Sequence, residues 1–303
     1  MNINYPLLLD GGLSNELEAQ GCDLNHPLWS ARLLERAPEA ITQAHLAYLK
    51  AGARCIITSS YQASMPGFLA NGYSRSAAET LLLRTVELAE KAVQDFMEIG
   101  FSSFRPLVAA SIGPYGAYLA DGSEYSGEYG VSDDELKEFH TSRIQLLDAT
   151  NADLLACETI PSTREAEILS DILLGTKKMA WISFSCKDEQ HLNDGTPIEE
   201  CMAIFAHHPN ILAIGVNCTA PVYISGLIRR IKDLSGEKKI IVYPNSGEVY
   251  DPESKTWSDT THSVAFKAMN KEWLRLGADI IGGCCRIGPH EIATLHELLK
   301  EIK

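Results

Sequence analysis

Eight short apolar segments recur along this sequence, and each is followed by a longer amphipathic one. The apolar segments are residues 6–12, 55–61, 106–113, 153–160, 179–186, 211–218, 239–247 and 279–285. Each is apolar along most of its length instead of alternating between apolar and polar residues. Because such runs are typical of parallel strands that are buried on both faces, we predict eight parallel strands.

The segments between the predicted strands have the periodicity of amphipathic helices. In the first of them, Ile41, Ala44, His45 and Tyr48 fall on one helical face. The predicted helices are residues 38–53, 76–100, 132–152, 162–175, 196–208, 220–236, 262–277 and 288–302.

Three of these helices carry recognisable start signals. Ser132 and Ser162 are each followed three residues later by a glutamate, which is the spacing of a capping box. Thr196 precedes Pro197, and proline is favoured at the first position of a helix because it needs no backbone N–H partner there.

Eight strand–helix units in strict alternation predict a single α/β domain, a (β/α)8 TIM-type barrel spanning residues 1–303. An open doubly wound sheet is the main rival, and the absence of a glycine-rich dinucleotide motif disfavours it. Three connections are longer than simple turns: residues 13–37, 114–131 and 247–261. All three follow predicted strands, so they should lie on the C-terminal face, where long loops usually build a site.

Composition argues against several classes of function. The formal net charge is −14, and Lys and Arg form no runs, so we expect no nucleic-acid partner. No stretch approaches the roughly 18 apolar residues of a membrane span. The first residues also lack the basic and apolar regions of a signal peptide. We therefore expect a cytoplasmic protein, without a membrane partner, whose eight cysteines are reduced thiols.

Three cysteines fall at the predicted C-terminal ends of strands. Cys218 ends the sixth strand, and Cys284 and Cys285 end the eighth. Strand ends converge at one mouth of a barrel, so the three thiols should meet there. Three converging cysteines favour a Zn²⁺ site, because a Cys₃ set leaves the fourth tetrahedral position open to water or substrate.

Adjacent strand residues point to opposite faces, so Cys284 and Cys285 can share one ion only where the strand breaks. Gly282 and Gly283 would permit such a bend, since glycine adopts backbone angles that are closed to other residues. A redox-active vicinal pair and simple packing remain open as alternatives. The other cysteines, at positions 22, 55, 157, 186 and 201, are expected to be small core residues.

Acidic and amide side chains also end predicted strands. Asp10 ends the first, Glu158 the fourth, and Asn217 lies at the end of the sixth. Two carboxylates at one mouth would suit the ammonium group of a substrate, although capping a helix or pairing with an arginine is the ordinary alternative. The Gly11-Gly12 pair fits close approach of the backbone to a ligand, or else a plain tight turn.

The connection 113–130 is rich in glycine and tyrosine and carries Asp121 and Glu124. Its aromatic and carboxylate groups would suit a lid over a cationic ligand. A flexible surface loop is the alternative. Residues 245–251 and Trp257 are candidates to join such a lid.

At these residues the sequence resembles the homocysteine S-methyltransferases. The resemblance runs along essentially the whole chain, through LLLDGG at 7–12, ACETIPS at 156–162, IGVNC at 214–218, YPNSGEVYD at 243–251 and GGCCR at 282–286. It implies a (β/α)8 methyltransferase with one Zn²⁺ per chain, which passes a methyl group to homocysteine and releases methionine.

The resemblance also implies roles for the site residues. The three cysteines would hold Zn²⁺ and accept the homocysteine sulfur as the fourth ligand, which would ionise that thiol. Asp10 and Glu158 would bind the homocysteine ammonium group. Asn217 would shape the metal site, and the backbone N–H groups around Gly11 and Gly12 are candidates for the homocysteine carboxylate.

The segment SIGPYGAYLADGSEY (111–125) is similar to the branch of the family that uses sulfonium donors, S-methylmethionine or S-adenosylmethionine. The chain also stops soon after its eighth predicted helix, whereas betaine-dependent members carry a C-terminal extension and folate-dependent ones carry further domains. We therefore expect a sulfonium donor. Betaine or a methylfolate as donor, and selenocysteine as acceptor, stay open.

A zinc-binding barrel without transferase activity and a thiol-redox barrel are alternatives from other classes of function. Asp10 and Glu158 argue against metal storage alone, because storage needs no amino-acid site. The sequence indicates no oligomeric state.

Overall fold

The computed structural model describes residues 3–25, 28–100, 104–247, 249–251, 256–258 and 263–302. Eight strands pair in parallel in the order β1-β10-β7-β6-β5-β4-β3-β2. Leu9, just after β1, forms a further parallel bridge with Cys55 in β2, so the two ends of this order meet. The strands are β1 (Leu7–Leu8), β2 (Cys55–Ile57), β3 (Leu107–Ile112), β4 (Leu154–Ile160), β5 (Ala180–Phe184), β6 (Ile211–Asn217), β7 (Lys239–Tyr243) and β10 (Ile280–Ile281).

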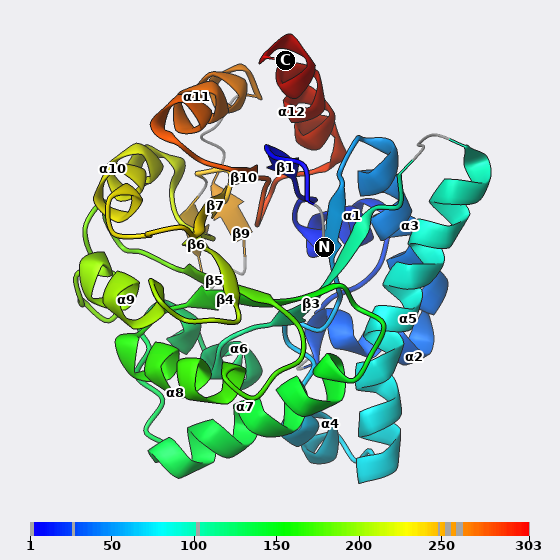
Figure 1. Cartoon of the computed structure of the whole chain (residues 1–303). Coiled ribbons are helices and arrows are strands. Elements are labelled where there is room, and N and C mark those ends of the chain that lie inside the picture. Colours follow the sequence, from blue (N-terminus) through cyan, green and yellow to red (C-terminus); the bar gives the residue numbers. More distant parts are fainter. Residues whose placement is uncertain are drawn as a thin grey trace.

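Helices surround this sheet as a ring, and the predicted (β/α)8 barrel is therefore confirmed (Figure 1). The predicted face of the first long helix is correct, since Ile41, Ala44, His45 and Tyr48 are all buried. The eight predicted helices are α3 (Pro38–Lys50), α5 (Arg75–Ile99), α7 (Asp133–Asp148), α8 (Thr163–Leu173), α9 (Ile198–Phe205), α10 (Pro221–Lys232), α11 (Ser263–Leu276) and α12 (Pro289–Ile302).

Short elements occupy the connections that were predicted only as long loops. Residues 13–37 contain three helical segments, residues 114–131 contain two, and residues 247–261 contain an antiparallel strand pair. Residues 248, 252–255 and 259–261 of the last connection lie outside the described residues. The additional elements are α1 (Leu13–Ala19), η1 (Trp29–Arg32), α2 (Leu33–Arg36), α4 (Met65–Ala70), α6 (Tyr115–Leu119), η2 (Ser123–Tyr125), β8 (Val249–Asp251) and β9 (Thr256–Ser258).

The predicted helix starts are correct in two cases and shifted in the third. The hydroxyls of Ser132 and Ser162 accept the backbone N–H three residues later, at 3.2 and 3.3 Å. Helix α9 begins at Ile198, so Pro197 precedes the helix instead of being its first residue. The reason is local, because Pro197 has an extended ψ of 135° and the N–H of Thr196 donates to Asp194 in a turn.

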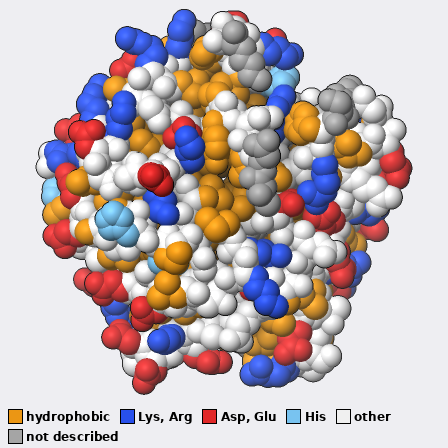
Figure 2. All heavy atoms as spheres, viewed as in Figure 1, with side chains coloured by type: hydrophobic (Ala, Val, Ile, Leu, Met, Phe, Trp, Pro, Cys, Tyr) orange, Lys and Arg blue, Asp and Glu red, His pale blue; other side chains and the backbone are white. Residues whose placement is uncertain are grey.

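Side chains inside the barrel change from apolar to polar along the strands. Every second residue faces inward, as the sequence Leu154, Ala156, Glu158 in β4 illustrates. In β6 the corresponding positions are Ala213 and Asn217. Inward-facing side chains in the N-terminal and middle parts of the barrel form an apolar core around the fully buried Trp181. Those at the C-terminal end of the strands are polar. The view along the barrel in Figure 2 shows hydrophobic side chains gathered at the centre of the molecule.

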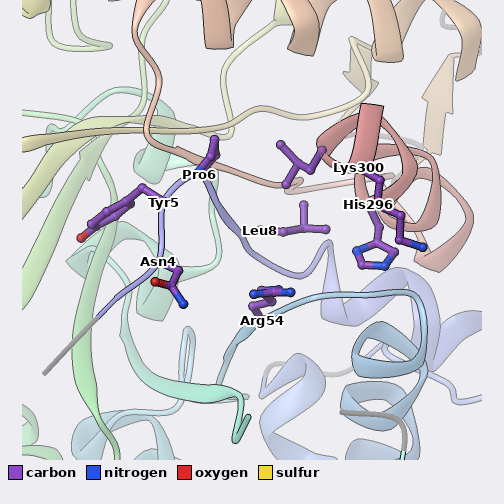
Figure 3. A pocket seen from close by; sticks show the side chains of 8 residues that line it. Asn4, Tyr5, Pro6, Leu8, Arg54, His296 and Lys300 are labelled. Atoms are coloured by element: carbon purple, nitrogen blue, oxygen red, sulfur yellow. The ribbon is translucent and has the colours of Figure 1, made fainter. Parts of the chain in front are cut away.

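A small cavity of about 90 Å³ lies at the opposite, N-terminal end of the strands. Figure 3 shows Arg54, just before β2, and His296 of α12 beside it, with Lys300 next to them. Substrate sites of such barrels lie at the C-terminal face, and the N-terminal face serves stability, so this cavity is not the candidate site. Among the described residues, no helix is both long and apolar enough to cross a membrane.

A buried ionic cluster fixes the connection that follows β3. The Glu165 carboxylate of α8 accepts hydrogen bonds from the backbone N–H of Tyr115 at 2.7 Å and from the Tyr129 hydroxyl at 2.6 Å. It also contacts Nε2 of His140 at 2.7 Å. Thus both ends of the segment 115–129 are fastened to a single carboxylate, which itself has no exposed surface.

The tautomer of His140 follows from its second neighbour. Arg143 approaches Nδ1 of His140 at 3.3 Å, and a guanidinium can only donate, so Nδ1 accepts and Nε2–H donates to Glu165. Burial lowers the pKa of His140, which favours this neutral ring. Arg143 also donates to the backbone carbonyls of Gly113 and Tyr61, so the cluster reaches the ends of both β2 and β3.

Replacing Glu165 by alanine should therefore destabilise the fold strongly. The change leaves the N–H of Tyr115, the Tyr129 hydroxyl and His140 without their acceptor, and Arg143 without a nearby counter-charge. We expect a loss of about 3–5 kcal/mol in the free energy of unfolding, measured by urea denaturation. Glu167→Ala, at an exposed position on the same helix, is the matched control. Equal stability of the two variants would show that Glu165 does not hold this segment.

Candidate metal centre

Three cysteine thiols meet at the C-terminal end of the barrel. The Sγ atoms of Cys218, Cys284 and Cys285 all lie within 4.8 Å of one another, and those of Cys218 and Cys285 are 3.6 Å apart. Cys218 follows β6 directly, and the other two lie in the turn after β10. Among the described residues, this is the group of cysteine, histidine and acidic side chains whose geometry could hold a metal ion.

The backbone turns sharply at these cysteines and directs the thiols to one point. Cys218 has a left-handed φ of 45°, and its N–H donates to the carbonyl of Tyr243 at 3.2 Å. The N–H of Cys284 donates to Pro244, and the carbonyl of Cys285 accepts from Ser246. The end of β7 therefore holds the other two strand ends in place.

The predicted break before Cys284 is present, but its cause differs from the one expected. Strand β10 ends at Ile281, and the left-handed φ of 64° occurs at Arg286, not at Gly282 or Gly283. The glycines are required for space instead. A Cβ atom on Gly283 would lie 2.1 Å from Cγ2 of Ile287, and one on Gly282 would lie 2.6 Å from Cβ of Leu9.

Asn217 links the cysteines to β4 and β5. Its Oδ1 accepts from the backbone N–H of Thr159 at 2.7 Å and from the Ser183 hydroxyl at 2.8 Å. Its Nδ2 donates to Oγ1 of Thr159 at 2.8 Å and faces Sγ of Cys284 at 4.0 Å. The amide is fully buried, so these contacts fix the residue that immediately precedes Cys218.

The two carboxylates predicted at the mouth are both buried, with 2% of Asp10 and 6% of Glu158 exposed. Glu158 accepts a hydrogen bond from the Ser111 hydroxyl, and burial raises its pKa to about 7. Oδ2 of Asp10 accepts the N–H of Ile57 at 2.8 Å. Burial, with a contribution from nearby Glu158, raises the pKa of Asp10 well above its ordinary value.

One oxygen of the Asp10 carboxylate is left without a hydrogen-bond partner among the described residues. This oxygen, Oδ1, is buried. Neither Asp10 nor Glu158 forms an ion pair with an arginine or lysine of the described chain, and neither caps a helix. Because a buried carboxylate without partners is costly, these oxygens are suited to accept hydrogen bonds from a ligand.

The two glycines after Asp10 approach the chain itself closely. A Cβ atom on Gly11 would lie 2.2 Å from the carbonyl oxygen of Ile287. The N–H of Gly12 donates to that same oxygen at 2.9 Å, so it is not free to bind a ligand. Close packing of the β1 end against the cysteine turn therefore explains this pair, and the N–H of Gly11 is the one that remains a candidate for a ligand.

The segment 113–130 folds over the cysteines. The hydroxyl of Tyr125 lies 3.7 Å from Sγ of Cys218. Burial raises the pKa of Glu124 to about 7, and Cys218 lies close enough to add to the effect. Asp121, the other acid predicted here, is exposed and accepts the N–H of Ser123 in a turn, so it takes no part in the site.

The three thiols differ in the direction of their pKa shifts. Hydrogen bonds from Cys284, Cys285 and Tyr125 lower the pKa of Cys218 well below its ordinary value. The pKa values of Cys284 and Cys285 are raised in turn, chiefly because both interact with Cys218. All eight cysteines are free thiols, and Cys55, Cys157, Cys186 and Cys201 are buried as expected of core residues.

Several residues of the site were not identified from the sequence. Ser111, Thr159 and Ser183 supply the hydrogen bonds described above, and the ring of Tyr243 lies beside Trp181, whose Nε1–H donates to its hydroxyl at 3.0 Å. Tyr61, just after β2, faces Glu124 and Cys218. Most of these residues lie at alternate positions of the predicted strands. Because every second strand residue faces the barrel interior, this alternation could have identified them from the sequence.

Comparison with known proteins identifies the family of this chain. The family model described as "Homocysteine S-methyltransferase" matches residues 7–299. The chain is 46% identical over 304 residues to Homocysteine S-methyltransferase YbgG of Bacillus subtilis, covering 99% of this chain and 96% of that protein. It is 44% identical over 291 residues to Homocysteine S-methyltransferase of Escherichia coli, with coverages of 95% and 94%.

A solved structure shows the same likeness in three dimensions. The metallated form of the homocysteine methyltransferase MmuM from Escherichia coli superposes with a TM-score of 0.86 at 41% identity, covering 96% of this chain and 95% of that chain. The match of the family model and the identity to these relatives both extend over nearly the whole chain. This protein is therefore an enzyme of the homocysteine S-methyltransferase family.

Proposed function

We propose that this enzyme is zinc-dependent and transfers a methyl group from a sulfonium donor, S-methylmethionine or S-adenosylmethionine, to the sulfur of homocysteine, forming methionine. One observation carries the proposal: three clustered thiols lie at the same barrel mouth as two buried carboxylates that have no cationic partner in the described chain. The thiols suit a soft metal ion, and the carboxylates suit an amino-acid ammonium group.

The cysteine cluster fits Zn²⁺. A tetrahedral zinc with bonds of about 2.3 Å to sulfur requires sulfur atoms about 3.8 Å apart. The Sγ atoms of Cys218 and Cys285 are 3.6 Å apart, and all three lie within 4.8 Å of one another. Three protein ligands leave one tetrahedral position for a substrate. Zn²⁺ bound here would stabilise the ionised form of a substrate thiol near neutral pH.

The chain's own residues would position the acceptor. Asp10 and Glu158 would take the ammonium group of homocysteine, the first through its unpartnered Oδ1. The N–H of Gly11 would bind the carboxylate. Asn217 would hold Cys284 in place through the amide that it directs at this sulfur. These contacts orient the acceptor sulfur before reaction, which is the main contribution that positioning can make to such a transfer.

The groups at the mouth are consistent with a sulfonium donor. In the transfer, the homocysteine sulfur forms a bond to the methyl carbon, and the electron pair of the broken carbon–sulfur bond stays on the donor sulfur. A sulfonium donor leaves as a neutral thioether, so the leaving group needs no proton. Within the segment 113–130, Tyr125 and Glu124 lie beside Cys218, and an aromatic ring and a carboxylate both suit a cation.

Replacing Cys284 by serine should abolish both metal binding and activity. Serine oxygen is a poor ligand for zinc beside two thiolates, so we expect zinc content to fall from about one per chain to below about one tenth. Metal analysis and methionine formation measure the two effects. Cys22→Ser, at a half-buried position outside the site, should keep both. Full zinc content in Cys284→Ser would refute the ligand assignment.

Replacing Glu158 by alanine should chiefly weaken the binding of homocysteine. The variant removes one of two carboxylates for the ammonium group, so we expect the KM for homocysteine to rise about 10–100-fold. The KM for the donor should change much less, and the zinc content should stay as in the wild type. An unchanged KM for homocysteine would refute this role.

A donor panel with homocysteine as acceptor tests the proposed donor class. Methionine formation should be supported by S-methylmethionine or S-adenosylmethionine, and betaine and a methylfolate should give none above background. Turnover with betaine or methylfolate alone would contradict the sulfonium assignment. Repeating the panel with selenocysteine tests the acceptor separately.

A further inference from the structure

We propose that Glu124, Tyr61 and Tyr125 form the binding site for the positively charged centre of the methyl donor. This inference rests on the proposed function and assigns a part of the site that the acceptor does not use. Glu124 and Tyr125 belong to η2, which lies over the cysteines, and Tyr61 reaches the same place from the end of β2.

Glu124 is a carboxylate that forms no ion pair with a lysine or arginine among the described residues. Its Oε2 is buried and has no hydrogen-bond partner among the described residues. Backbone N–H groups, of Gly122 and of Glu124 itself, are the described groups that stabilise the ionised carboxylate. Leaving such an oxygen unpaired is unfavourable, so a positively charged ligand at this point would remove the cost.

The position of Glu124 is fixed by close backbone packing. A Cβ atom on Gly116 would lie 2.2 Å from the backbone nitrogen of Glu124, so only glycine lets η2 approach α6 this closely. The segment is anchored on both sides by the hydrogen bonds from Tyr115 and Tyr129 to Glu165. Glu124 is therefore held toward the thiols by the fold, and its neighbour Asp121 is not.

Two tyrosines complete the surroundings of a cation. Tyr125 has 41% of its residue surface exposed although its hydroxyl contacts Cys218, so the chain does not fully cover this residue. Tyr61 lies close enough to Glu124 and Cys218 to interact with them electrostatically, and its hydroxyl forms a hydrogen bond with the Thr159 side chain. Aromatic rings attract cations, and sulfonium groups share with ammonium groups the spread positive charge that such rings bind.

The acceptor and the donor would thus meet separate carboxylates. Asp10 and Glu158 lie near one another and would serve the ammonium of homocysteine, whereas Glu124 interacts with Asp121 and Cys218. Arg143, the guanidinium that reaches this region, is turned to the carbonyls of Tyr61 and Gly113 and to His140. Arg143 is therefore engaged elsewhere, and Glu124 is available to the cation whose methyl group must point at the acceptor sulfur.

The test compares Glu124→Gln with the wild type and with Glu128→Gln, an exposed position in the same segment. Glutamine keeps the shape of the side chain and removes its charge. In Glu124→Gln we expect the KM for S-methylmethionine to rise about tenfold or more, and the KM for homocysteine to stay within about twofold. Thermal unfolding and zinc content, which should match the wild type, exclude a folding defect.

Calorimetry with two inert analogues of S-methylmethionine tests the charge directly and needs no turnover. One analogue carries a trimethylammonium group in place of the sulfonium, and the other is the neutral carbon isostere. The wild type and Glu128→Gln should bind the cationic analogue about tenfold or more tightly than the neutral one, and Glu124→Gln should lose this preference.

The outcomes separate this inference from the proposed function. If the wild type makes no methionine from any sulfonium donor, the proposed function is refuted. The preference for the cationic over the neutral analogue, measured by calorimetry, still tests the cation site in that case. An unchanged preference in Glu124→Gln overturns the inference. A rise confined to the KM for homocysteine also overturns it, because Glu124 would then act on the acceptor.

Discussion

Closure of the parallel sheet is the constraint on which the site depends. Strand β1 pairs with β10 on one side, and the Leu9–Cys55 bridge joins it to β2 on the other. Residue 10 is thereby fixed next to the cysteine turn, where the N–H of Gly283 donates to the Asp10 carbonyl at 3.0 Å. An open sheet of the same strands would leave β1 and β2 at opposite edges, and the groups that they carry would not meet at one mouth.

The strand ends are locked to one another by backbone hydrogen bonds and by one buried amide. Cys218 is held by Tyr243, Cys284 by Pro244, and Asn217 connects Thr159 and Ser183. Most of the atoms that fix the thiols are therefore uncharged. These uncharged backbone and amide groups hold the thiols and carboxylates in position without pairing with their charges, which leaves the charges available to ligands.

Much of the architecture could be predicted from sequence because it follows from periodicity. Continuous apolar runs identified all eight strands, and their polar ends identified Asp10, Glu158, Asn217 and the cysteines as neighbours. The short elements η1, η2, β8 and β9 could not be predicted, since three or four residues carry no measurable period. Their conformation depends on tertiary contacts.

Glu165 shows why local patterns are ambiguous. Its spacing from Ser162 is that of a capping box, and the Ser162 hydroxyl does accept the Glu165 N–H. The Glu165 carboxylate, however, binds Tyr115, Tyr129 and His140 instead of returning to the helix start. Three donors outweigh one backbone N–H at the helix start, and this competition depends on residues 25–50 positions away, which a local motif does not include.

The acidic groups at the barrel mouth explain why the site should bind positively charged ligands. Burial raises the pKa of Asp10, and it raises the pKa values of Glu158 and Glu124 to about 7. Ionisation of these three carboxyl groups is therefore unfavourable unless a cation binds beside them. A metal cation at the thiols, an ammonium group at Asp10 and Glu158, and a donor cation at Glu124 would each favour the ionised form of the groups that they contact. Ligands that bind only the folded protein stabilise it. The buried carboxylates and thiols are costly to ionise without a cation, so they would bind positive groups that are arranged around one sulfur atom.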